Sequence, residues 1–519
     1  MYNFYLLILS SMFSKVFSVS VNGLSGNKID VELDVSNGMP AFNIVGLPDA
    51  AIQESKERVR SALKNSGFTF PSTRITVNLA PADIRKKWPS FDLPIAIGIL
   101  CREQDFVEEY IQNSLFVGEL ALDGKLRGVN AILPSVIFAK EQGMKYVFLP
   151  QENLEEASLI PGVHLVWVSD LSSLIRILSG TDPFPVHTPI DPKVYIEKYK
   201  SSVKVAGFEH IIGQEHAKRA LTIAAAGWHN ILMEWPPGSG KTMLAKAFAT
   251  ILPDMDFSEI VDVSKIYSVA GLLSKAHPLI FTRPFRKVHH TASDISIIGG
   301  GRDSRPGEIS LAHKWVLFLD EFLEFDGKLL EMLRQPLEDG EISINRVNAS
   351  YVYPAKFVLI GALNPCPCGF LWDKEKSCIC SGSQIERYRS KLSWPILDRI
   401  DLFIKVPRIK VEDFQEHKKQ PKTSKELKDQ IEAARIFWKN RFQGTKKTYN
   451  AEMGNEDVEK YCTLKPEEDM FIKNAVERLN LSTRIYFRIL KLARTIADLE
   501  GSPDIKLPHL AEALSYRKV

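Results

Sequence analysis

A strand, a glycine-rich turn and a helix follow one another in ILMEWPPGSGKTMLAKAF (231–248), and this order constrains the fold more than any other feature of the chain. The apolar start is typical of a buried strand. In a P-loop, backbone N–H groups and the helix N-terminus surround phosphate oxygens. We therefore expect Lys241 to contact the β- and γ-phosphates of ATP and Thr242 to hold Mg²⁺. The other residues expected around the nucleotide are Pro236, Pro237, Gly238, Ser239, Gly240 and Met243.

A second apolar strand, WVLFLDE (315–321), ends in two carboxylates. Asp320 would bind Mg²⁺ through water, and Glu321 would polarise the water that attacks the γ-phosphate. The two motifs occur in the expected order, and each follows an apolar strand. Together they predict an ATP-hydrolysing α/β domain with a parallel sheet.

Three further polar residues are candidates for sensing or completing the nucleotide site. Asn364 ends the strand-like run FVLIGALN and could sense the γ-phosphate, or it could cap the following turn. Arg399 in LDRID is either an arginine finger that reaches a neighbouring protomer's ATP or one partner of a structural salt bridge. Arg484 in LSTRIYFRIL is either a second sensor on a C-terminal helix or an ordinary surface charge.

One residue departs from the P-loop pattern GxxxxGK[ST]. The pattern begins with a glycine, which allows a tight turn and a close approach of backbone to phosphate, but this chain has Trp235 there. As written, the sequence therefore predicts an impaired ATP site.

The 519 residues are too many for one hydrophobic core, so we expect several domains. Alternating strand-like and helix-like runs predict an α/β domain over 12–178, and the Pro-bearing stretch 179–206 is predicted to be a linker. Residues 207–405 contain the nucleotide motifs, and 406–519 are predicted to form a helical lid. Residues 1–11 form a doubtful extension, because Met12 is a more plausible start.

No apolar run is long enough to span a membrane, and the first eleven residues lack the basic region and cleavage site of a signal peptide, so a cytoplasmic location is expected. The net charge of +3 does not by itself indicate a nucleic-acid-binding protein. A local basic segment contains Arg283, Arg286 and Lys287, before His289 and His290. It could belong to an inserted hairpin that touches DNA phosphates, or it could be a solvated loop. The two histidines are not assigned as metal ligands from sequence.

Four of the six cysteines form two Cys-x-Cys pairs, Cys366 with Cys368 and Cys378 with Cys380. Four thiolates satisfy tetrahedral Zn²⁺, although the spacing is not the usual Cys-x₂-Cys. The cluster is therefore either a structural zinc site close to Asn364 or a group of reduced, unliganded cysteines.

Several segments, read together, resemble magnesium-chelatase-like AAA+ ATPases of the ComM/YifB type. These include VELDVSNGMPAFNIVGLPDAAIQESKERVRSAL, GQEHAKRAL, RPFRKVHHTAS, GGGRDSRPGEISLAH, LRQPLEDGEI, NPCPCGF and LARTIADLEG. The resemblance covers almost the whole chain after Met12. It implies a Lon-protease-like N-terminal domain, a AAA+ core, a helical lid and a ring, expected to be a homohexamer. ComM-type members drive branch migration of DNA during natural transformation.

Two departures from these families matter. The Lon protease uses a Ser–Lys pair, but the lysine position falls near Leu133 here, and we see no base beside Ser90. The domain is therefore expected to organise partners or the ring rather than to cleave peptides. The second departure is a set of six tryptophans at family glycine positions, with Trp167 as a further candidate: Trp88, Trp228, Trp235, Trp315, Trp372 and Trp394.

We hypothesise that these tryptophans are translation artefacts, since some bacterial lineages read UGA as glycine. The codons of the gene decide between this hypothesis and a genuinely Trp-rich core. Trp438 falls at a usual glutamine and is not part of the set.

Three functions remain open at this point. The first is an ATP-driven motor on single-stranded or branched DNA, with helicase or branch-migration activity. The second is an ATPase that remodels a protein partner, as the chelatase subunit does. The third is a nucleotide-binding scaffold, which follows if Trp235 is genuine.

Overall fold

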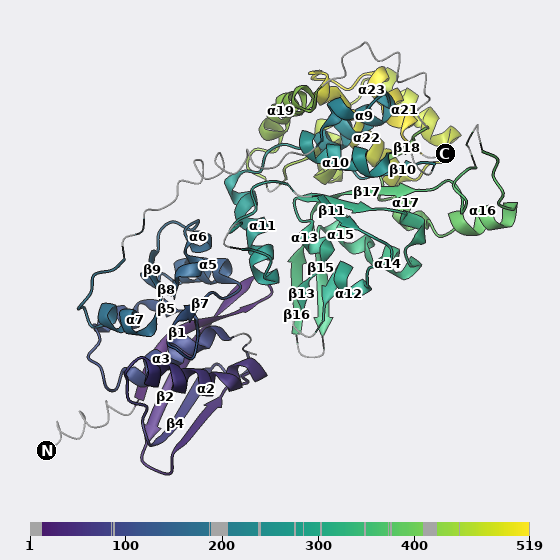
Figure 1. The fold of residues 1–519 in the computed structure, drawn as a ribbon. Coiled ribbons are helices and arrows are strands. Elements are labelled where there is room, and N and C mark those ends of the chain that lie inside the picture. Colours follow the sequence, from purple (N-terminus) through teal and green to yellow (C-terminus); the bar gives the residue numbers. More distant parts are fainter. Residues whose placement is uncertain are drawn as a thin grey trace. The chain divides into compact units, whose positions relative to one another are not determined.

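The computed structural model describes residues 13–517 except 85, 87–88, 186, 188–205, 237–239, 275–276, 284, 302–303, 347–348, 372, 374–375, 408–422 and 446. The chain forms two compact units (Figure 1). The first unit contains Met1–Tyr199 and Phe257–Phe281, and the second contains Lys200–Asp256 and Thr282–Val519. The predicted extension 1–11 and most of the predicted linker lie outside the described residues, as do Trp88, Trp372, Pro237, Gly238 and Ser239.

The first unit begins with a four-stranded sheet of order β1-β2-β4-β3. Its strands are β1 (Phe13–Asn22), β2 (Ser25–Ser36), β3 (Ala41–Val45) and β4 (Arg74–Ala80). Along β2, Ile29, Val31, Leu33 and Val35 are buried and alternate with less buried residues, because successive side chains of a strand point to opposite faces. The helices α2 (Ala50–Asn65) and α3 (Asp92–Leu100) share the hydrophobic core of this sheet.

A three-stranded parallel sheet completes the first unit, with order β5-β8-β9. Its strands are β5 (Ser114–Phe116), β8 (Tyr146–Pro150) and β9 (His164–Val168). The other described elements of this region are η1 (Pro89–Phe91), α4 (Glu108–Gln112), β6 (Glu119–Leu120), β7 (Leu126–Arg127), α5 (Ile132–Glu141), η2 (Gln151–Asn153), α6 (Leu154–Ala157) and α7 (Leu171–Leu178). Leu133, at the position expected for a catalytic lysine, is fully buried in the core.

Helix α11 (Phe257–Ala270) belongs to the first unit although it follows the P-loop in sequence. It packs against α5, and its Val269 joins the core of the first unit. Ser268 also donates a 2.5 Å hydrogen bond to the buried carboxylate of Glu156. The sequence-based domain 207–405 includes α11, whereas the structure places this helix in the first unit. The packing partner of an amphipathic helix cannot be inferred from its own sequence.

A five-stranded parallel sheet forms the centre of the second unit, with order β11-β14-β17-β10-β18. The strands are β10 (Ile231–Glu234), β11 (Phe285–Val288), β14 (Trp315–Leu319), β17 (Phe357–Leu363) and β18 (Leu402–Lys405). All residues of β14 and β17 are buried. Continuous apolar strands of this kind are typical of a parallel sheet covered on both faces.

Two antiparallel pairs and several short helices are attached to this sheet. The pairs are β12 (Gly299–Gly300) with β13 (Arg305–Pro306), and β15 (Glu341–Arg346) with β16 (Ala349–Pro354). The first pair lies between the two nucleotide motifs, where an inserted hairpin was predicted. The helices are η3 (Phe208–His210), α9 (Glu215–Gly227), α10 (Lys241–Ile251), α12 (Asp294–Ile298), α13 (Glu308–Leu311), η4 (Phe322–Glu324), α14 (Gly327–Met332), α15 (Arg334–Asp339), α16 (Gly382–Arg389) and α17 (Trp394–Leu397).

The end of the chain is helical, as predicted. Its elements are α19 (Ser424–Arg441), η5 (Asn450–Glu452), α20 (Asn455–Tyr461), α21 (Pro466–Arg478), α22 (Thr483–Leu499) and α23 (Leu507–Ser515). Helices α19 and α22 contact α9, and α19 also contacts α10, so the C-terminal helices share one core with the P-loop helix (Figure 1). The predicted α/β class, with a parallel sheet and a helical C-terminal region, is confirmed. Among the described residues, no helix has the length and apolarity that crossing a membrane requires.

A fully buried carboxylate, Asp498, ties the C-terminal helices together. Arg441 donates two hydrogen bonds of 2.8 Å to it, and Arg494 donates one of 3.0 Å. The indole N–H of Trp438 and the amide of Asn450 also donate to Asp498, at 3.0 and 2.8 Å. A buried charge with this many donors is stabilising only while its partners remain.

We therefore predict that Asp498→Ala destabilises the second unit by about 3–5 kcal/mol, because two buried guanidinium groups lose their counter-charge. Thermal unfolding monitored by circular dichroism should show a melting temperature lower by about 6 °C or more. Asp429→Ala, at an exposed position on α19, is the matched control and should leave the melting temperature within about 1 °C. Equal melting temperatures for the two variants would contradict the role assigned to Asp498.

Candidate nucleotide site

The strand ends of the second unit bring the predicted nucleotide residues to one edge of the sheet. Strand β10 pairs with β17 in parallel, with Glu234 opposite Leu363, and β17 pairs with β14. Because the carboxyl ends of parallel strands meet at one edge, the residues that follow these strands converge there. Gly240 has φ of 83° and precedes α10, so a residue without Cβ makes the turn into the P-loop helix.

Lys241 and Asn364 are in direct contact at this edge. The ammonium group of Lys241 donates a 2.5 Å hydrogen bond to the side-chain oxygen of Asn364. Burial lowers the pKa of Lys241, and the charges of Asp320 and Glu321 oppose this effect. Four predicted residues therefore share one electrostatic environment, in which the lysine needs an anionic partner.

The acidic pair has cationic partners from the neighbouring strand β11. Lys287 lies 3.0 Å from a carboxylate oxygen of Asp320, and the backbone N–H of Glu321 donates to the other oxygen at 3.1 Å. Glu321 has φ of 54°, and its carboxylate lies 3.0 Å from Nδ1 of His290. Sequence reasoning considered Lys287 only as part of a basic loop and did not connect His290 with Glu321, because both contacts depend on β11 being next to β14.

The basic segment before His289 is not a free loop. Arg283 is buried and donates to the backbone oxygens of Pro253 and Lys314, at 2.6 and 2.5 Å. Arg286 forms a bidentate pair with Glu308, both hydrogen bonds being 2.6 Å. Both arginines therefore have partners within the chain, which the prediction of either a DNA-contacting hairpin or a solvated loop did not include, and contact of this segment with DNA stays a prediction.

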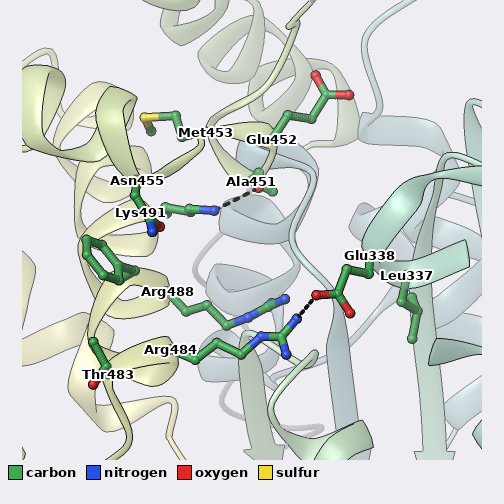
Figure 2. A pocket seen from close by; sticks show the side chains of 11 residues that line it. Leu337, Glu338, Ala451, Glu452, Met453, Asn455, Thr483, Arg484, Arg488 and Lys491 are labelled. Atoms are coloured by element: carbon green, nitrogen blue, oxygen red, sulfur yellow. Dashed lines mark hydrogen bonds and ion pairs between the residues drawn. The ribbon is translucent and has the colours of Figure 1, made fainter. Parts of the chain in front are cut away.

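Arg399 and Arg484 form a second group, around Glu338. Each donates to one oxygen of the Glu338 carboxylate, and Arg399 also donates to the Pro395 carbonyl at 2.7 Å. The side chain of Arg399 is only 7% exposed, whereas that of Arg484 is 40% exposed. Arg484 and Glu338 both line a cavity of about 510 Å³. Figure 2 shows the side chain of Arg484 pointing to Glu338. The structure therefore places these arginines together and gives Arg399 the salt bridge that its sequence context also allowed.

Arg389 is a residue that sequence reasoning missed. It pairs with Glu234 at 2.9 Å and donates to the Pro365 carbonyl at 3.3 Å. It thereby connects the end of β10 with the loop that follows Asn364. The only signal was its position in the basic run ERYRSK, which does not identify a partner.

The four clustered cysteines are close enough to share one ion. The sulfur of Cys366 lies 3.4 Å from that of Cys368 and 3.6 Å from that of Cys378, and all four sulfurs lie within 4.8 Å of one another. Tetrahedral Zn²⁺ with Zn–S bonds of about 2.3 Å places its sulfurs about 3.8 Å apart. A backbone N–H of Phe370 lowers the pKa of Cys368 to about 6, which favours the thiolate.

The tryptophans of the sequence occupy unlike environments. Trp235 is fully buried in the hydrophobic core, and its indole N–H has no hydrogen-bond partner among the described atoms. Trp228 has φ of 63° at the end of α9, a left-handed conformation that favours glycine and is an outlier for a bulky side chain. Trp315 is buried, and Trp394 is 76% exposed. The conformation of Trp228 agrees with a glycine at that position, and the reading of the seven codons stays a prediction.

The contact between Lys241 and Asn364 generates a test. We predict that Asn364→Asp weakens ATP binding by about tenfold or more, because a carboxylate holds the ammonium by a charge-assisted bond of about 1.5–3 kcal/mol and repels the phosphates. Asn364→Ala should weaken binding less, since it frees Lys241. The control is Asn345→Asp, which adds the same charge on the β15–β16 hairpin. Calorimetric titration with a non-hydrolysable ATP analogue measures all three, and equal affinities for the two Asn364 variants would refute the role of this contact.

Three family models match the chain. They are "Magnesium chelatase, subunit ChlI" over residues 207–414, "Subunit ChlI of Mg-chelatase" over 31–153, and "Magnesium chelatase, subunit ChlI C-terminal" over 421–517. Together they cover the nucleotide motifs, the N-terminal α/β region and the C-terminal helices.

Curated relatives match over nearly the full length. The chain is 41% identical over 502 residues to Competence protein ComM of Haemophilus influenzae, covering 97% of each chain. It is 38% identical over 497 residues to the protein YifB of Escherichia coli, covering 96% of this chain and 95% of that one. A shorter match, 29% over 161 residues, links 30% of this chain with 23% of the Magnesium-chelatase 67 kDa subunit of Chlorobaculum tepidum. With its P-loop, acidic strand end and helical C-terminal region, this chain belongs to the magnesium-chelatase-like AAA+ proteins of the ComM/YifB type.

Proposed function

We propose that this chain is a DNA-stimulated ATPase that works as a homohexameric ring and drives branch migration or helicase activity on incoming DNA. The observation that carries the ATPase part is the meeting of Lys241, Asn364 and the acidic pair Asp320–Glu321 at one sheet edge. The DNA part is supported by the near full-length similarity to a protein named for competence. A cytoplasmic location follows from this role.

The residues at the sheet edge fit ATP with Mg²⁺. The hydroxyl of Thr242 and the carboxylate of Asp320 are the hard oxygen ligands that Mg²⁺ prefers, and the bound ion neutralises phosphate charge. Lys241 would exchange its bond to Asn364 for a bond to the phosphates, since an ammonium group binds an anionic oxygen more strongly than the neutral oxygen of an amide. Asn364 is then free to contact the γ-phosphate, and Glu321 orients the attacking water. Pro236, Pro237, Gly238, Ser239, Gly240 and Met243 would complete the cradle.

We infer that Arg399 acts on the nucleotide of a neighbouring protomer and that Arg484, on the lid helix, is a second sensor of nucleotide. Both arginines form ion pairs with Glu338 and not with the Lys241–Asn364 pair. A guanidinium group stabilises the charge on a transferring phosphoryl group, and the triphosphate of a neighbour competes with Glu338 for it. In this view both arginines remain paired with Glu338 in the isolated protomer and leave it when a ring forms.

Each domain would have a different role. The Lon-like domain 12–178 would organise the ring or its partners, 179–206 would link it to the AAA+ core 207–405, and the lid 406–519 would carry Arg484. Zn²⁺ on Cys366, Cys368, Cys378 and Cys380 would brace the loop that begins at Asn364, because Cys366 is two residues away.

A second candidate function is the remodelling of a protein partner. It is favoured by the partial match to the Magnesium-chelatase 67 kDa subunit. An inactive scaffold is the third candidate, and it depends on Trp235 being the native residue at the start of the P-loop.

ATP hydrolysis with and without branched DNA separates these functions. Two versions of the chain would be compared, one as written and one with glycine at Trp88, Trp167, Trp228, Trp235, Trp315, Trp372 and Trp394. We predict that the glycine version hydrolyses ATP and is stimulated by DNA, whereas the written version is inactive, because an indole replaces the glycine of the phosphate turn. Trp394→Gly alone, at an exposed position, is the control and should not restore activity, because Trp235 remains. Hydrolysis that ignores DNA in both versions would contradict the DNA motor and favour a protein partner.

A further inference from the structure

His289 and His290 form a cluster with the carboxylate of Glu321, and the ATPase role proposed for Glu321 does not account for the two histidines. Strand β11 runs parallel to β14 with Val288 opposite Leu319, so the residues two positions beyond these strand ends, His290 and Glu321, come together. One donor atom from each of the three side chains lies within 4.8 Å of the others. The cluster is thus made by the sheet itself and not by a chance crossing of loops.

The contact between His290 and Glu321 does not have the geometry of an ordinary hydrogen bond. Nδ1 of His290 lies 3.0 Å from Oε2 of Glu321, but this buried nitrogen has no hydrogen-bond partner among the described atoms. Two donors bound at about 2.0–2.1 Å to one ion, at about 95–110° to each other, lie about 3.0–3.4 Å apart. The observed separation of 3.0 Å therefore matches the spacing of two ligands of one metal ion.

The second histidine is positioned to join them. The rings of His289 and His290 are 4.2 Å apart between centroids, and Nδ1 of His289 lies 3.0 Å from the hydroxyl of Thr291. A polar contact to a ring nitrogen fixes the orientation of the imidazole, as in known metal sites. Two imidazoles and one carboxylate form the ligand set of several zinc enzymes.

We propose that His289, His290 and Glu321 bind one transition-metal ion of the Zn²⁺ class, and that this ion inhibits ATP hydrolysis. Imidazole selects Zn²⁺, Co²⁺ and Ni²⁺ over Mg²⁺, which prefers oxygen ligands, so the ion differs from the one that accompanies ATP. The inhibitory part rests on the proposed function, since a carboxylate bound to the ion cannot orient the attacking water. The carboxylate of Asp320 is not part of this site, because it pairs with the ammonium group of Lys287 at 3.0 Å.

Calorimetric titration tests the site without any nucleotide. The full chain would first receive one equivalent of Zn²⁺ to fill the cysteine cluster and would then be titrated with Co²⁺. We expect one further equivalent, whose visible spectrum lacks sulfur charge-transfer bands. His289→Gln should weaken this second site at least tenfold, and His289→Gln with His290→Gln should remove it. His210→Gln, at an exposed position in the same unit, is the control and should keep it.

The inhibition is tested separately on the glycine version of the chain, which is the one predicted to hydrolyse ATP, in the presence of excess Mg²⁺ and ATP. Added Zn²⁺ should lower hydrolysis at least tenfold, a zinc-selective chelator should restore it, and His289→Gln should raise the Zn²⁺ concentration needed. Absence of a second equivalent, or equal binding by the double variant, would overturn the site. Binding without inhibition would overturn the regulatory role. A chain that never hydrolyses ATP would contradict the proposed function instead, while the calorimetry would still report on the site.

Discussion

Parallel pairing around β10 is the constraint on which the whole site depends. Backbone hydrogen bonds fix Glu234 opposite Leu363 and Leu319 opposite Gly361, so the strand ends cannot slide past one another without breaking the ladder. The P-loop, the acidic pair and the sensor position each follow one of these ends. The apolar strands and the helices on both faces keep the strand ends in register. A shift of one strand by one residue would move each of its side chains to the other face of the sheet.

Charge balance is the second organising feature of the unit. Without phosphates, Asp320 has Lys287, Glu321 has His290, and Glu338 has two arginines. A triphosphate brings several negative charges, and it competes with these carboxylates for the same cations. Nucleotide binding, metal binding at the histidines and assembly with a neighbour would therefore be coupled through a small number of shared charges.

The sequence predicted the part of the site that lies on contiguous motifs. Lys241, Asp320 and Asn364 each follow an apolar run, so their convergence could be expected from the parallel-sheet rule alone. The cationic partners could not be expected in the same way. Lys287 and His290 reach the acidic pair only because β11 lies next to β14, and strand order is not written in local sequence.

Two further differences between the sequence-based prediction and the structure also arise because contact partners cannot be inferred from local sequence. Helix α11 packs in the first unit although it follows the P-loop, since its apolar face finds its partner in α5. Arg283 and Arg286 looked like a basic loop because charge patterns do not reveal whether an acidic or carbonyl partner is near. By contrast, the helical character of the C-terminal region could be expected, because the segment that forms α22 has strong amphipathic spacing.

The central claim is that Arg399 of each protomer completes the nucleotide site of its neighbour. The most direct test mixes two inactive variants, Arg399→Ala and Lys241→Ala, in the version of the chain that hydrolyses ATP. Arg399→Ala alone should still bind ATP but hydrolyse it about 10³-fold more slowly or worse. A 1:1 mixture should regain up to about a quarter of the activity, because random assembly of a head-to-tail ring pairs an intact Lys241 with a neighbour's intact Arg399 at that frequency. A mixture as inactive as its separate components would contradict the account and leave Arg399 as a structural partner of Glu338.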